Sequence, residues 1–176
     1  MRYLITLLFC GMLAPAASAQ NKVMPVVPFG GVFEVPEATV TPDPQLEYKL
    51  IIDVATGAEQ PDSLSEGLYR VARLMNLLSV GGVPDDQVDV VLAIHGGAAF
   101  SVANNRRYRE KHGTDNPNLP LLTALKEAGV RITVCGQSLL KNDIAPADIA
   151  PEVELATSML TTVAMYQMRG YGMMKF

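Results

Sequence analysis

Three short apolar runs, each followed by a segment with helical features, constrain the fold of this sequence more than any other feature. The runs cover residues 48–54, 88–94 and 130–135. Apolar runs of this length are typical of strands that are buried on both faces of a sheet. Strands that alternate with helices are joined by right-handed crossovers. The pattern therefore predicts an α/β fold, with a mainly parallel sheet and helices on both of its faces.

The helices between these runs are predicted from apolar spacing and from start and stop signals. Five apolar residues recur at three- and four-residue steps and would share one helix face: Leu64, Leu68, Val71, Met75 and Leu78. Ser63 and Glu66 fit a capping box at the start of this helix, and Gly81-Gly82 would stop it. Further helices are expected within residues 99–111, around residues 119–125 and at about residues 158–168. Short strands are expected at residues 153–156 and 171–176.

The first nineteen residues have the form of a secretory signal peptide. Arg2 precedes a short apolar run at residues 3–13, and Ala17-Ser18-Ala19 fits the small-x-small rule for cleavage. The apolar run is shorter than the roughly 20 residues needed to span a bilayer. We therefore expect cleavage after Ala19, a periplasmic or secreted protein, and no membrane span in the mature chain.

Residues 20–46 combine five prolines with many apolar side chains. Proline lacks a backbone donor, which argues against a helix or a central strand here. The segment is predicted to be an extended arm laid over the domain or over a neighbouring subunit, and a loose N-terminus is the alternative. The chain thus divides into a signal peptide at 1–19, an arm at 20–46 and an α/β domain at 47–176.

Charge and aromatic content limit the classes of partner. The chain has 14 basic and 18 acidic residues, a formal net charge of −4, and no tryptophan. No basic excess is available to neutralise phosphates, and few aromatic side chains are available to stack on bases. We therefore do not expect nucleic acid to be a partner.

Three chemically capable side chains are expected at one edge of the sheet. Asp53, His95 and Cys135 each lie at or near the carboxyl end of a predicted strand, and parallel sheets bind ligands beyond these ends. Cys135 would be the one cysteine of the mature chain, because Cys10 leaves with the signal peptide. A lone cysteine in an exported protein is buried and inert, paired between chains, or reactive.

The residues around Cys135 favour a reactive thiol, although an inert core cysteine is the alternative. A helical turn after Gly136 would offer backbone donors to a thiolate, and the small Gly136 would permit a second sulfur to approach. His95 is a candidate base or thiolate partner, or a histidine bonded to a loop backbone. His112 is expected at the surface. Residues 106–111 are interpreted as a solvated basic helix face, with attraction of an anionic sulfur compound as the alternative.

Other chemical signatures are missing from the sequence. It has no Cys-x-x-Cys pair, no phosphate-binding loop with its Gly-Lys-Ser/Thr end, and no dinucleotide fingerprint. We expect neither a cofactor nor a metal ion. A small soft-metal site built from Cys135 and His95 is the weaker alternative.

The domain resembles the DsrE/DsrF-like family, and in particular its exported members. The resemblance is carried by VVLAIHGGA at 90–98, by NPNLPLLTALKEAGVRITVCGQSL at 116–139 and by QMRGYGMMKF at 167–176. It extends from Tyr48 to the C-terminus. It implies a three-layer α/β/α fold with a mostly parallel sheet of about five strands, and homo-oligomers that are commonly trimers or hexamers.

The resemblance also implies a function. Some cytoplasmic relatives carry persulfide sulfur on a cysteine at the end of a central strand, and Cys135 matches that place. The leading hypothesis is a sulfur carrier that uses Cys135, with His95 and the backbone of Gly96, Gly136 and Gln137 shaping the site. Its partners would be a sulfane-sulfur donor and acceptor. The other hypothesis is a non-catalytic, oligomeric binding or scaffold module with a structural cysteine.

Overall fold

A computed structural model describes residues 22–176, and the expected signal peptide lies outside the described residues. Five strands form one sheet in the order β4-β3-β2-β1-β5, and every neighbouring pair is parallel. The strands are β1 (Tyr48–Val54), β2 (Val88–Ile94), β3 (Arg131–Cys135), β4 (Val153–Ala156) and β5 (Gly172–Lys175). The helices are α1 (Glu66–Val80), α2 (Asn105–His112), α3 (Leu119–Glu127), α4 (Gly136–Lys141) and α5 (Met159–Met168). The predicted α/β fold is confirmed.

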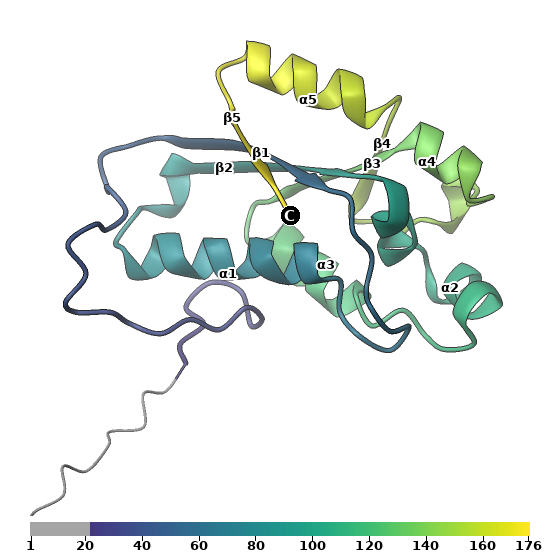
Figure 1. Ribbon diagram of the computed structural model, residues 1–176, viewed down its shortest axis with the longest axis horizontal. Helices are drawn as coiled ribbons and strands as arrows, with labels where there is room; N and C mark the ends of the chain where they lie inside the picture. The colour runs from purple at the N-terminus through teal and green to yellow at the C-terminus, as the bar shows by residue number, and fades with distance from the viewer. Residues whose placement is uncertain (1–21) are drawn as a thin grey trace, which may run out of the picture.

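The helices cover the sheet unequally on its two faces. Figure 1 shows α1 and α3 beneath the sheet and α5 alone above it. The lower face forms the larger apolar core, with Leu68, Val71 and Leu122 among its buried members. The upper core is a small cluster between α5 and the inner strands: Ile51, Val91, Ala93, Val163 and Tyr166. No helix in the described part of the chain is long and apolar enough to cross a membrane.

The first helix begins later than its sequence signal predicts. α1 starts at Glu66 with Ser65 as its N-cap residue, and the Ser65 side chain makes no capping hydrogen bond. The capping box at Ser63 is therefore wrong. The Ser65 amide instead donates to Oδ1 of Asn118 over 2.7 Å, so a buried side chain from a distant segment satisfies it.

The helix expected within residues 99–111 is present as α2, and a 3-10 helix at Gly96–Val102 precedes it. The helical turn expected after Gly136 is part of α4, which begins at Gly136 immediately after β3. The end of β3 therefore lies directly at the start of a helix.

The proline-rich segment lies over α1, where a buried asparagine holds it. Asn76 is fully buried. Its Oδ1 accepts hydrogen bonds from the amides of Val26 and Val27, and its Nδ2 donates to the carbonyls of Val27, Phe29 and Gly30. Gly30 has a φ of +66°, and a Cβ there would lie 2.3 Å from the Arg73 amide nitrogen. The arm backbone therefore passes directly against the helix.

Candidate functional site

The carboxyl ends of four neighbouring strands bring together the polar side chains that the sequence placed at strand ends. Asp53 lies near the end of β1, His95 follows β2 and Cys135 ends β3. Lys175 of β5 pairs with Asp53 in the register of the sheet. The site is thus built from residues far apart in the sequence, which the parallel order aligns at one edge.

The buried Asp53 pairs with the half-buried His95. The Nε2 atom of His95 lies 2.5 Å from Oδ1 of Asp53, and Nζ of Lys175 lies 3.9 Å from Oδ2. Asp53 is only 2% exposed, and a buried carboxylate is strongly destabilising unless it is paired. The His95 amide also donates to the Val54 carbonyl over 2.9 Å. His95 therefore contacts a carboxylate through its ring and holds the loop after β2 through its backbone.

Cys135 lies where the starts of two helices meet. It is the N-cap residue of α4, and its side chain is 5% exposed. Burial raises the pKa of its thiol, but the Met159 amide, the Ser138 side chain and the Ser138 and Gln137 amides interact with the sulfur and together bring the pKa below its ordinary value. Helix starts favour negative charge, so this environment favours the thiolate.

Ser138 joins α4, which Cys135 caps, to the loop that carries His95. The Gly96 amide donates to Oγ of Ser138 over 3.0 Å, and the Ser138 side chain lowers the pKa of the Cys135 thiol. Among the hydrogen bonds of the described residues, none joins His95 directly to Cys135. The sequence interpretation did not include Ser138, whose only signal was its position three residues after the cysteine.

Gly136 packs closely on the end of β4. A Cβ at this position would lie 2.9 Å from the carbonyl oxygen of Ala156, so the glycine permits close packing of α4 on β4. Its expected role in admitting a second sulfur stays a prediction. Gly96 has a φ of +56°, in the left-handed region that favours glycine. Nε2 of Gln137 donates to the Thr157 carbonyl over 3.5 Å.

The pocket next to Cys135 in the chain is uncharged. Its volume is about 350 Å³, and it lies between α4 and the end of β4. Its lining contains no charged side chain: Gly136, Gln137, Leu139, Leu140, Ile144, Pro146, Leu155, Ala156 and Thr157. Leu140 and Leu155 at this pocket are exposed. The lining suits an apolar molecule better than an anion.

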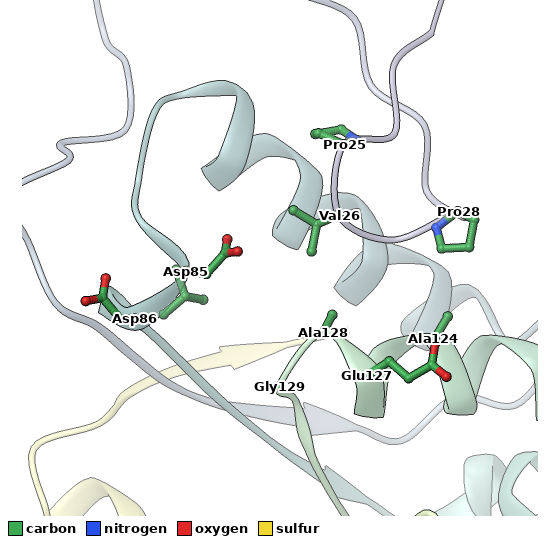
Figure 2. Close-up of a pocket in the computed structure, with 10 residues that line it drawn as sticks. Pro25, Val26, Pro28, Asp85, Asp86, Ala124, Glu127, Ala128 and Gly129 are labelled. Carbon is green, nitrogen blue, oxygen red and sulfur yellow. The ribbon is translucent and has the colours of Figure 1, made fainter.

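A second pocket, of about 590 Å³, lies at the opposite end of the sheet (Figure 2). Pro25 and Pro28 of the arm border it, and Asp85, Asp86 and Glu127 contribute carboxylates. It adjoins the segments that precede β2 and β3, so neither Cys135 nor His95 lines it. We therefore assign the candidate chemistry to the carboxyl edge.

The basic segment is largely neutralised by neighbouring carboxylates. Arg106 contacts both Glu110 and Asp148, and Arg109 lies 2.5 Å from Asp115. Because these carboxylates neutralise much of the positive charge of residues 106–111, the structure gives little support to the alternative that this segment attracts an anionic sulfur compound.

His112 is not a simple surface residue. Its ring packs against Phe100 and Tyr108, with ring centroids 5.4 and 4.4 Å away. Burial and the neighbouring Lys111 lower the pKa of His112. Within the described residues, no group of three or more histidine, cysteine or acidic side chains is placed to hold a metal ion.

Comparisons with known proteins agree with this architecture. The model of the DsrE/DsrF-like family matches residues 49–176. A protein of unknown function from Methanobacterium thermoautotrophicum is similar in structure, with a TM-score of 0.53 at 15% identity, over 73% of this chain and 99% of that one. The ychN protein from E. coli gives a TM-score of 0.55 at 18% identity, with the same coverage. No curated protein matches the chain.

Proposed function

Because the chain belongs to the DsrE/DsrF-like family, we propose that it is a sulfur-transfer protein that carries persulfide sulfur on Cys135. The observation that carries this proposal is the environment of the thiol. A buried cysteine with no special partners has a raised pKa, whereas the pKa of Cys135 is lowered by the groups around its sulfur. A thiolate is the form that attacks sulfur.

The loading step moves one zero-valent sulfur atom and needs no external oxidant. The Cys135 thiolate attacks the outer sulfur of a protonated donor persulfide, R–S–SH, and a new S–S bond forms as the donor's S–S bond breaks. The donor leaves as R–S⁻, and the protein becomes Cys135–S–SH, which can lose its proton to water. Delivery is the same exchange in reverse, with an acceptor thiolate attacking the outer sulfur of Cys135–S–SH.

A carrier role fits the cysteine content better than disulfide exchange does. Cys135 is the only cysteine among residues 22–176, and catalytic disulfide exchange normally uses a second, resolving thiol. The uncharged pocket beside α4 further favours a neutral organic persulfide or polysulfide over thiosulfate as the donor.

The direct test is intact-mass spectrometry of protein that begins at Gln20. After incubation with an organic polysulfide, we expect the mass of one or more sulfur atoms to be added, and a thiol reductant to remove it. A thiosulfate arm run in parallel is expected to load more slowly. Absence of any adduct, with Cys135 also resistant to alkylation, would contradict the carrier function and favour the binding module with a structural cysteine.

We also propose that the protein is exported and forms homo-oligomers. Export follows from the signal-like residues 1–19, and the family resemblance implies trimers or hexamers. The outer face of α5 supports self-association, because Leu160, Met165 and Met168 are exposed there. A helix that is apolar all round is normally covered on every side, and we infer that a second copy of the chain covers this one.

Substitution of Met168 by glutamate is expected to shift the molar mass toward the monomer, because association would then bury a charge without a partner. Light scattering coupled to size exclusion measures this shift. Gln167→Glu is the matched control, since it adds the same charge one residue away. An oligomer that survives Met168→Glu unchanged would exclude this face as the interface.

A further inference from the structure

Asp53, His95 and Cys135 share one face of the sheet at its carboxyl edge. Ile94 of β2 pairs with Val134 of β3, and His95 and Cys135 are the residues that come next. Ile94 and Val134 belong to the larger core beneath the sheet, and Asp53 lies between two β1 residues of that core. Because His95 and Cys135 keep an extended backbone and side chains alternate along it, all three side chains face the side that α5 covers.

The two ring nitrogens of His95 have different surroundings. Nε2 lies 2.5 Å from Oδ1 of Asp53, and an ionised carboxylate can only accept a hydrogen bond, so Nε2 carries the proton. Nδ1 then holds a lone pair, and it makes no hydrogen bond within residues 22–176. No buried side-chain nitrogen or oxygen of these residues lacks a partner, and the His95 side chain is 22% exposed. Nδ1 is therefore open to solvent and available as a base.

This base is available to a second thiol that approaches the cysteine. Among the described residues no hydrogen bond joins His95 to Cys135, and His95 is not one of the groups that lower the pKa of the Cys135 thiol. Delivery of sulfur needs an acceptor in its thiolate form. Only about 3% of a thiol with a pKa of about 8.5 is ionised at pH 7. A base beside the sulfur would therefore speed delivery.

We propose that Asp53 is a positioning residue that holds His95 in the tautomer protonated on Nε2, so that Nδ1 takes the proton of an acceptor thiol that unloads Cys135. The inference rests on the proposed carrier function and deepens it. Nδ1 accepts the proton of R–SH, and R–S⁻ attacks the outer sulfur of Cys135–S–SH. The S–S bond of the protein breaks, and R–S–SH and Cys135–S⁻ are formed. The Asp53 carboxylate stabilises the imidazolium until its Nδ1 proton passes to water.

Lys175 decides how an asparagine at position 53 would be oriented. Its Nζ lies 3.9 Å from Oδ2 of Asp53 and can only donate. In Asp53→Asn the amide oxygen is expected to stay toward Lys175, which leaves the amide NH₂ facing Nε2 of His95. Nε2 must then accept, so the ring proton moves to Nδ1 and the base is lost. Tyr166, the titratable side chain of α5, lies at the other edge of the sheet, where it bonds Arg131.

The first measurement is the ring tautomer of His95, read from ¹⁵N NMR of protein that begins at Gln20. We expect the proton on Nε2 in the wild type and on Nδ1 in Asp53→Asn. A wild-type ring protonated on Nδ1 would overturn the inference.

The second measurement is sulfur delivery in a single turnover, from protein loaded with an organic polysulfide to two acceptor thiols. With an alkyl thiol of pKa about 8.5, Asp53→Asn is expected to slow delivery about tenfold at pH 7, within the ceiling of about thirtyfold that the ionised fraction sets. The difference should vanish above about pH 9, where the thiol ionises without a base. An aryl thiol that is already ionised at pH 7 is expected to react at the wild-type rate.

Three further variants test whether Asp53 acts through His95. His95→Gln should show the same deficit, and the double variant should lose nothing more, because the two residues act as a unit. His95 is half-buried, so this variant keeps the test open if Asp53→Asn does not fold. Asp85→Asn removes an equal charge at the opposite end of the sheet and is expected to change neither measurement.

The outcomes separate this inference from the function on which it rests. Unchanged delivery to the alkyl thiol in Asp53→Asn and His95→Gln would overturn it, and an equal loss with both thiols would reduce Asp53 to a structural residue. If the wild type takes up no sulfur, the carrier function fails and the base role fails with it. The ring tautomers then still decide whether Asp53 positions His95.

Discussion

Replacement of Cys135 by serine is expected to abolish sulfur loading completely while the fold is kept. The serine hydroxyl fits the same position at the start of α4 and can accept the amide contacts that now reach the sulfur. It is not ionised near neutral pH and cannot attack a sulfane sulfur. Intact-mass spectrometry after incubation with an organic polysulfide should therefore show no adduct on this variant.

The control for this result is structural. Cys135→Ser is expected to change the free energy of unfolding by no more than about 1 kcal/mol, since the substitution is nearly isosteric. Circular dichroism and the melting temperature should confirm a native fold. An adduct that persists on Cys135→Ser would place the sulfur elsewhere in the protein and would contradict the carrier function assigned to this thiol.

Replacement of Asn76 by alanine is expected to cause a large loss of stability. The buried amide makes five hydrogen bonds to the backbone of residues 26–30, and alanine would leave several of these groups without partners. We expect the free energy of unfolding to fall by about 3 kcal/mol. For a chain of this size, the melting temperature should fall by roughly 6 to 12 °C.

Denaturant unfolding measures this effect, and Arg73→Ala on the same helix is the matched control. The Arg73 side chain is exposed, so its removal should change the free energy of unfolding by less than about 0.5 kcal/mol. Limited proteolysis should cut Asn76→Ala within the arm sooner than the wild type. Equal stability of Asn76→Ala and Arg73→Ala would show that the arm contributes little to the fold.

The strands were predictable because a buried strand has a recognisable local composition. Tyr48–Val54 and Val88–Ile94 match the predicted runs residue for residue, since a strand covered on both faces needs a continuous apolar run. Only a helical turn was predicted where α4 forms, because six residues are too few to show helical periodicity. The start of α1 was placed wrongly because it depends on a distant contact: Asn118, fifty-three residues away, accepts a hydrogen bond from the amide of the N-cap residue Ser65.

The candidate site was predictable only in outline. The positions of His95 and Cys135 after two apolar runs indicated one edge of a parallel sheet, because carboxyl ends align there. Which side chains touch there depends on register and helix placement. The contact between Asp53 and His95 spans 42 residues, and so does the bond between Gly96 and Ser138. No local pattern encodes either one.

The sequence by itself determined the α/β class, the strands, the lone cysteine of the described domain and the family resemblance. All of these depend on the order and apolarity of neighbouring residues. The tertiary structure alone decided that His95 pairs with Asp53, that Ser138 links the His95 loop to α4, and that two helix starts meet at Cys135. The physical reason is that these contacts arise only when the crossovers bring the ends of distant strands together. The reactivity of the thiol depends on what then surrounds it.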